Sequence, residues 1–187
     1  MRMAGRGMVA AGETTRAGAA RRRAVFEDAY AANYQLILAY ALRRAPTPDD
    51  AADVVAETFL TAWRRLDDVP EGPAARLWLY GVARLVLANQ QRARRRRERL
   101  GERLQSAAAR AEAVRPPDDA AVPDAVRAAF RRLRPDDQEI LTLVAVEGLT
   151  AAEVGQVLGC SGVAVRVRLH RARSRFAREL ASAGVTG

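Results

Sequence analysis

Residues 149–176 have the sequence LTAAEVGQVLGCSGVAVRVRLHRARSRF, which predicts two helices joined by a tight turn. Thr150 followed by Glu153 is a capping box, in which a hydroxyl and a carboxylate satisfy free backbone N–H groups at the start of the first helix. Gly159 is expected to end that helix, because glycine accepts the left-handed backbone of a helix C-terminus. Ser161 is a favoured N-cap for the second helix. Together these signals predict a helix-turn-helix.

The second of these helices has one apolar face and one free, basic face. At about 100° per residue, Val165, Leu169, Ala172 and Phe176 lie on the same side and are expected to pack. Four arginines flank the opposite side: Arg166, Arg168, Arg173 and Arg175. This arrangement suits a helix in a DNA major groove, with its outward side chains at base edges and its guanidiniums at phosphates. A solvent-exposed basic helix without a DNA partner is the alternative interpretation.

The whole chain is strongly basic. Its 187 residues include 31 Lys and Arg against 22 Asp and Glu, which gives a net charge of +9. The positive charge is concentrated at residues 21–23, 92–103 and 166–178. Clustered arginine favours a polyanionic partner, because guanidinium binds phosphate in a bidentate manner and releases its counterions. A membrane-binding helix would need bulky apolar residues opposite the charge, so nucleic acid is the leading candidate.

Composition also favours a cytoplasmic protein that does not enter a membrane. The longest apolar runs, such as residues 140–146, are too short to cross a bilayer, and the N-terminal arginines are not followed by the apolar core of a secretion signal. The single cysteine, Cys160, cannot form an internal disulfide and suits a reducing compartment. We interpret Cys160 as a small packing residue in the turn, with a redox role as the alternative.

Helical periodicity without convincing strand alternation predicts an all-α fold of two small helical domains joined by a flexible linker. The first domain is expected to hold three helices, the second of which begins at Thr47 with Pro48 in its first turn. The linker is expected where apolar residues become sparse and prolines interrupt the chain. The expected boundaries are 1–22 for a disordered basic tail, 23–97 for the first domain, 98–122 for the linker, 123–182 for the second domain and 183–187 for a C-terminal tail.

The sequence contains no catalytic constellation, and we predict that the chain is not an enzyme and uses no cofactor. His170 is the only histidine, and there is no Gly-rich phosphate loop. Asp49, Asp50, Asp53 and Glu57 follow one another on one predicted helix, whereas metal sites usually draw carboxylates from several elements. We therefore interpret these residues as an acidic helix face, and we predict no metal site.

Three passages together resemble the bacterial extracytoplasmic-function (ECF) sigma factors, which are small alternative sigma subunits of RNA polymerase. The passages are DDAADVVAETFLTAW at 49–63, RLWLYGVARLVLANQQRARRRR at 76–97 and the helix-turn-helix. The resemblance covers nearly all of residues 25–180. It implies a first domain, similar to sigma region 2, that binds the polymerase clamp and melts and reads the minus-ten element. It implies a second domain, similar to sigma region 4, that reads the minus-thirty-five element and docks on the polymerase flap.

The resemblance also implies partners and contact residues. The partners are core RNA polymerase and promoter DNA, and members of the family are often held inactive by an anti-sigma factor. A base pulled from the duplex needs an aromatic surface next to basic side chains. Carried over by position, the contact residues are Asp50, Asp53, Val54, Glu57 and Thr61 for core polymerase; Arg76, Trp78, Tyr80, Arg84, Asn89 and Arg92 for the minus-ten element and melting; and Val163, Arg166, Val167, Arg168, His170 and Arg171 for the minus-thirty-five element.

Some of the assigned contact residues also have an interpretation that involves no partner. The acidic row around Asp53 and Glu57 could serve solubility alone, and Trp78 could belong to the core. A stand-alone helix-turn-helix regulator is the alternative function. It would explain residues 149–176 but would leave the acidic helix at 49–63 and the aromatic and basic helix at 76–97 without a role.

Overall fold

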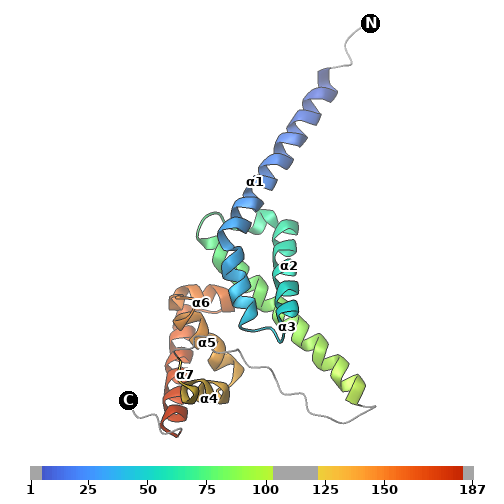
Figure 1. Ribbon diagram of the computed structural model, residues 1–187. Coiled ribbons are helices and arrows are strands. Elements are labelled where there is room, and N and C mark those ends of the chain that lie inside the picture. Colours follow the sequence, from blue (N-terminus) through green and yellow to red (C-terminus); the bar gives the residue numbers. More distant parts are fainter. Residues whose placement is uncertain (1–5, 103–121, 183–187) are drawn as a thin grey trace.

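The computed structural model describes residues 6–102 and 122–182, and these residues form helices joined by turns (Figure 1). The first domain contains α1 (Arg6–Leu42), α2 (Pro48–Arg64), a short 3-10 turn η1 (Leu66–Asp68) and α3 (Ala74–Glu102). The second contains α4 (Asp124–Arg132), α5 (Pro135–Ala145), α6 (Ala151–Leu158) and α7 (Gly162–Ser182). No β-strand occurs in either described range, which confirms the prediction of an all-α fold.

The first domain is built on the apolar stripe of α2. The predicted helix start is confirmed, because the Thr47 hydroxyl accepts a hydrogen bond from the Asp50 backbone N–H at 3.1 Å and Pro48 occupies the first turn. Val55 and Phe59 are buried, as the helical spacing predicts, and the Phe59 ring contacts aromatic rings of α1. The stripe therefore holds α2 against α1 and α3.

Leu85 departs from the broad apolar surface predicted for α3. Its side chain is 53% exposed, whereas Leu79 and Leu87 on the same helix are buried. At about 100° per residue, Leu85 lies on the opposite side of the helix from these two residues. The buried face of α3 is therefore narrower than its apolar composition suggests.

The N-terminal tail also differs from the prediction. Residues expected to be disordered up to position 22 are helical from Arg6 onward, because alanine and arginine favour helix even where no apolar face has to be buried. Figure 1 shows this part of α1 extending away from the packed body. Similarly, α3 runs to Glu102 and includes the start of the expected linker. Residues 1–5, 103–121 and 183–187 lie outside the described residues.

The second domain contains the predicted helix-turn-helix as α6 and α7. The capping box is confirmed, since the Thr150 N–H donates to Glu153 Oε2 at 2.8 Å and the Glu153 N–H donates to Thr150 Oγ1 at 3.3 Å. Gly159 has φ = 67° and ends α6 in the left-handed region. Ser161 Oγ accepts from the Ala164 N–H at 3.2 Å, as expected of an N-cap.

The two domains pack against each other, chiefly through α3 and α6. One continuous set of buried apolar residues includes Leu79 of α3 and Val154 of α6. Figure 1 accordingly shows α5 and α6 beside the C-terminal end of α1, with α4 and α7 farther from the first domain. This compact arrangement decides which predicted contact residues are accessible. Within residues 6–102 and 122–182, no helix combines the length and apolar composition that a membrane span requires.

Candidate nucleic-acid and polymerase interfaces

The free face of α7 is available to a ligand. Val165, Leu169 and Ala172 are buried and hold α7 against the other helices of the domain. The opposite row is exposed, and Val163 and Val167 are 61% and 47% exposed although they are apolar. The structure exposes every residue of the set assigned to the minus-thirty-five element: Val163, Arg166, Val167, Arg168, His170 and Arg171.

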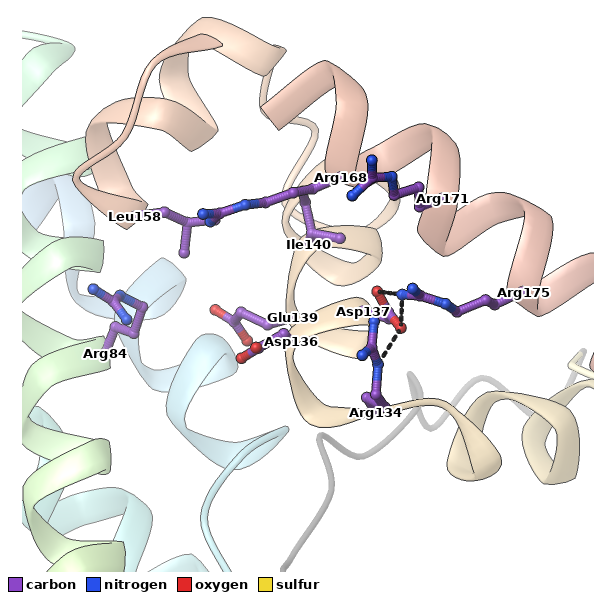
Figure 2. Close-up of a pocket in the computed structure, with 10 residues that line it drawn as sticks. All are labelled: Arg84, Arg134, Asp136, Asp137, Glu139, Ile140, Leu158, Arg168, Arg171 and Arg175. Atoms are coloured by element: carbon purple, nitrogen blue, oxygen red, sulfur yellow. Dashed lines mark hydrogen bonds and ion pairs between the residues drawn. The ribbon is translucent and has the colours of Figure 1, made fainter. Parts of the chain in front are cut away.

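An ion pair fixes the direction of α7. Arg175 Nη1 donates to both carboxylate oxygens of Asp137 on α5, at 2.9 and 2.8 Å, and Arg134 Nε donates to the same carboxylate at 3.3 Å (Figure 2). The Asp137 side chain is almost fully buried, so this contact is shielded from solvent. Sequence reasoning placed Arg175 on the DNA-facing flank. The structure instead uses it to position α7 on α5.

The residues assigned to the minus-ten element do not form one exposed surface. Asn89 and Arg92 are exposed, and Arg92 Nη2 donates to Asn89 Oδ1. Arg76 is partly buried and lies 3.6 Å from Glu153 of the second domain. Trp78 is half-buried against the core, with the Arg65 guanidinium 5.9 Å from its ring centroid. The end of α3 near Asn89 is therefore more accessible than its beginning.

Tyr80 is the clearest departure within this set, because it is only 1% exposed. Its hydroxyl donates to Glu147 Oε2 of the second domain at 3.1 Å. Burial, together with the nearby Glu147 carboxylate, raises the pKa of the Tyr80 phenol. The prediction that Tyr80 is a surface contact is wrong for the compact arrangement, because the second domain covers this side chain.

Tyr80 belongs to a polar network between the domains that sequence reasoning missed. The Tyr40 hydroxyl donates to Glu139 Oε1 at 2.9 Å, and Arg44 Nε donates to Glu139 Oε2 at 2.8 Å. Glu147, whose side chain is 4% exposed, also accepts from Arg43 Nη2 at 2.5 Å. We call these residues the interdomain network: Tyr40, Arg43, Arg44, Tyr80, Glu139 and Glu147. Every donor lies in the first domain, and both acceptors lie in the second.

The acidic face of α2 is only partly as predicted. Asp53 and Glu57 are exposed one turn apart, and Thr61 is half-buried next to them. Asp50 is half-buried and accepts a hydrogen bond from the Thr47 hydroxyl at 2.8 Å. Val54 is 0% exposed, so its assignment to the polymerase-contacting set is wrong. Val54 and Val55 are consecutive on α2, so their side chains point about 100° apart, and both lie within the buried face of the helix.

A groove of about 630 Å³ runs beside this acidic face, between α2 and α3. Its walls include Asp53 and Glu57 together with Leu60 and Leu85, two leucines that are exposed. Carboxylates beside exposed leucines suit a basic protein helix better than DNA, because the phosphates of DNA would be repelled. The geometry therefore favours a protein partner at this face.

The arginines of both domains meet at a cavity of about 350 Å³ between them. Figure 2 shows Arg84 reaching this cavity from α3, while Arg168 and Arg171 reach it from α7. Carboxylates of α5, among them Asp136 and Glu139, offset part of this charge. In the compact arrangement, residues assigned to two different promoter elements therefore line the same cavity.

The described residues contain no group of three or more His, Cys, Asp or Glu side chains placed to hold a metal ion. Cys160 is half-buried against the core, and its sulfur lies 4.0 Å from Arg168 Nη1. This position agrees with a packing role in the turn between α6 and α7.

Comparisons with known protein families match both domains. The model of sigma-70 region 2 matches residues 29–97, and the model of sigma-70 region 4 matches residues 124–176. The region 2 match begins within α1 and ends within α3, and the region 4 match begins at the start of α4 and ends within α7.

Curated relatives are sigma factors. RNA polymerase sigma factor CnrH of Cupriavidus metallidurans is 32% identical over 155 residues, which are 78% of this chain and 81% of CnrH. ECF RNA polymerase sigma factor SigL of Mycobacterium tuberculosis is 29% identical over 178 residues, 90% of this chain and 96% of SigL. The probable RNA polymerase sigma factor RfaY of Xanthomonas campestris is 35% identical over 147 residues. These are 75% of this chain but 37% of RfaY, so the chain spans well under half the length of that relative.

A solved structure has the same fold. It is the sigma factor RpoE in complex with the anti-sigma factor NepR from Bartonella quintana, with a TM-score of 0.64 and 21% identity, covering 83% of this chain and 96% of RpoE. At this identity the similarity concerns the arrangement of helices.

Proposed function

Because the chain belongs to the ECF family of RNA polymerase sigma factors, we propose that it binds core RNA polymerase and directs it to specific promoters. The observation that carries this function is the exposed row of α7 on a rigid helix-turn-helix, paired with an acidic protein-binding face on a separate domain. A stand-alone DNA-binding regulator would use only the first of these features. The match of residues 29–97 to region 2 leaves that alternative without support.

In this function α7 lies in the major groove of the minus-thirty-five element. Arg166, Arg168 and Arg171 supply guanidiniums for guanine edges or phosphates, and His170 contacts either. Val163 and Val167 are suited to thymine methyl groups, which explains why two apolar side chains remain exposed on a basic face. Arg175 positions the helix through Asp137 and is not needed as a DNA contact.

The end of α3 contacts the minus-ten element. Asn89 and Arg92 are accessible for base and phosphate contacts, and Trp78 offers a partly exposed ring at the other end of the helix. Arg76 and Arg84 lie at the boundary with the second domain, so they become fully available when the domains separate.

The acidic face of α2 contacts the polymerase clamp through Asp53, Glu57 and Thr61, with Asp50 at its edge. The exposed Leu60 and Leu85 beside these residues supply apolar contact area. The second domain docks on the polymerase flap. An anti-sigma factor is a further partner, because RpoE was solved with the anti-sigma factor NepR. A protein that acts with these partners would work in the cytoplasm of a bacterium.

Bipartite recognition requires the two domains to separate. Elements centred near positions −10 and −35 are about 25 base pairs apart, which is about 85 Å along B-DNA. Arg84 and Arg171 instead line one cavity of about 350 Å³. The compact arrangement is therefore a closed state, and the promoter-bound state is open.

Replacing Arg171 with alanine is expected to weaken minus-thirty-five recognition by about 1–3 kcal/mol at one base pair, because a bidentate guanidinium contact would be lost. The measurement is competition among promoters with a randomised minus-thirty-five element for the complex of core polymerase and this chain. Arg173→Ala, which removes another exposed arginine from the same helix, is the matched control and should leave base preference unchanged. An unchanged preference in Arg171→Ala, with only a shallower salt dependence, would make Arg171 a phosphate contact.

A further inference from the structure

The cavity of about 350 Å³ between the domains has an excess of positive charge, because five arginines and three carboxylates line it. Arg134 and Arg175 are both paired with Asp137, and Glu139 accepts hydrogen bonds from the first domain. Within the described residues, the other three arginines form no ion pair with a carboxylate. We call them the cavity arginines: Arg84, Arg168 and Arg171.

The cavity arginines come from two domains and two walls. Figure 2 shows Arg84 entering the cavity from α3, while Arg168 extends from α7 in the direction of α3. Asp136 offsets one of the three charges at most, so like charges face each other across the cavity. An anion with several charges, placed between the walls, would attract both of them at once and hold the domains together.

Arg84 also has an unsatisfied hydrogen-bond donor. Its side chain is half-buried, and its Nε atom is buried without a hydrogen-bond partner. A buried donor without an acceptor is unfavourable. The protein therefore supplies this wall of the cavity with charge and a donor but with no carboxylate for the Arg84 guanidinium.

The chemistry of the walls favours a small phosphorylated ligand. Guanidinium binds phosphate oxygens in a bidentate manner, and a chain of phosphates presents such oxygens to both walls. The apolar part of the wall, among the described residues, consists of Ile140 and Leu158, which gives little area to an apolar ligand. A volume of about 350 Å³ lies at the lower end of the range of small-molecule sites, about 300–1,000 Å³.

We propose that this cavity binds the phosphate chain of a small oligophosphate, either inorganic triphosphate or a nucleoside triphosphate, and that the bound chain bridges Arg84 to Arg168 and Arg171. Such a ligand binds the closed state in preference to the open state, so it shifts the equilibrium toward closure. Because Arg168 and Arg171 are also proposed contacts of the minus-thirty-five element, the ligand and the promoter would compete. That consequence rests on the proposed function, whereas the site itself does not.

The test is isothermal titration calorimetry of the full-length chain with inorganic triphosphate, in magnesium-free buffer at constant ionic strength. Arg84→Gln should weaken binding at least about tenfold, because the charged contact from the first domain would be lost. Arg96→Gln is the matched control, since it removes an exposed arginine from α3 outside the cavity. It should change the affinity by less than about twofold.

Two results of this titration would overturn the proposal. The first is an equal change in Arg84→Gln and Arg96→Gln, when circular dichroism shows both variants to be folded, since net charge alone would then explain the binding. The second is an affinity for sulfate, at the same ionic strength, that equals the affinity for triphosphate. The site would then hold any anion and would not recognise a phosphate chain.

A parallel titration with ATP distinguishes the two sources of the phosphate chain. Tighter binding of ATP than of inorganic triphosphate would mean that the nucleoside adds contacts, and would identify a nucleotide as the ligand. Equal or weaker binding of ATP would identify the phosphate chain alone as the recognised group. Failure of both compounds to bind more tightly than sulfate would contradict the proposal.

Hydrogen exchange on the unchanged chain keeps the proposal testable if Arg84→Gln does not fold. Saturation with inorganic triphosphate should slow amide exchange in α3 around Arg84 as well as in α7, because the ligand holds the two domains together. Slower exchange confined to α7 would contradict bridging and would mean that triphosphate only occupies the exposed basic face of that helix. Failure of the chain to support transcription with core polymerase would contradict the proposed function and leave these results unaffected.

Discussion

Reversal of Asp53 and Glu57 to arginine is expected to abolish binding to core RNA polymerase while leaving the first domain folded. Both side chains are exposed on α2, and neither contributes to the core. Among the residues that the structure describes, Glu57 has only a long, exposed ion pair with Arg64 at 3.8 Å, so its loss costs little stability. Like charges placed against a basic partner surface cost several kcal/mol, so affinity for core polymerase should fall at least about a hundredfold.

The matched control for this prediction is Asp28→Arg/Glu71→Arg. Asp28 and Glu71 are exposed acidic residues of the first domain, and they line a different groove, between α1 and the loop before α3. This variant has the same change in net charge and should retain core binding in co-elution by gel filtration. If Asp53→Arg/Glu57→Arg still bound core polymerase, the acidic face of α2 would not be a polymerase contact and would serve solubility alone.

Replacement of Gly155 with alanine is expected to destabilise the helix-turn-helix strongly. A Cβ atom at position 155 would lie 2.6 Å from the Cys160 carbonyl oxygen and 3.2 Å from the Gly162 backbone nitrogen. Both neighbours are backbone atoms of the turn between α6 and α7, and the Cys160 N–H also donates to the Gly155 carbonyl at 2.9 Å. Relief of this overlap requires α6 and α7 to move apart, which we expect to cost about 3 kcal/mol.

Urea unfolding monitored by circular dichroism measures this cost. Gly81→Ala is the control, because Gly81 is also inside a helix but its added Cβ would have Val157 O at 3.8 Å as its nearest neighbour. It should be neutral or stabilising by up to about 1 kcal/mol, since alanine favours helix over glycine. Equal stability of the two variants would mean that the turn does not hold α6 and α7 as closely as the structure indicates.

The local signals in the sequence predicted the helix-turn-helix well because its ends are determined by neighbouring residues. The hydroxyl and carboxylate of Thr150 and Glu153, the left-handed Gly159 and the N-cap Ser161 act over three or four positions. The buried face of α7 follows from the helical period alone. The family resemblance rested on this helix-turn-helix together with residues 49–63 and 76–97, and the matches to regions 2 and 4 confirm it.

The interdomain network could not be predicted in the same way. Tyr40 and Glu139 are 99 residues apart, and the helical period shows which face of a helix is apolar but not which distant residue will meet it. Tyr80 was assigned to the minus-ten contacts through the family resemblance, although only the packing of the second domain decides whether its side chain is covered. Val54 was assigned to the polymerase-contacting set although it faces the core, because the resemblance assigns whole stretches of a helix and does not separate its buried from its exposed positions.

The proposed closed state would give the chain a physical reason to act only together with polymerase. The free protein keeps Tyr80 covered and holds Arg84 near Arg171, so it cannot span two promoter elements. Core polymerase, by binding the two domains at separate sites, would stabilise the open state. A ligand can shift such an equilibrium only by binding the two states with different affinities.

Transcription in vitro from sheared genomic DNA of the source bacterium, with sequencing of RNA 5′ ends, tests the central claim most directly. Core polymerase with this chain should produce a discrete set of start sites that share two sequence elements, centred about 10 and 35 base pairs upstream. Neither core polymerase alone nor the chain alone should produce this set. Start sites identical to those of core polymerase alone, while the chain binds a particular duplex tightly without polymerase, would contradict the account.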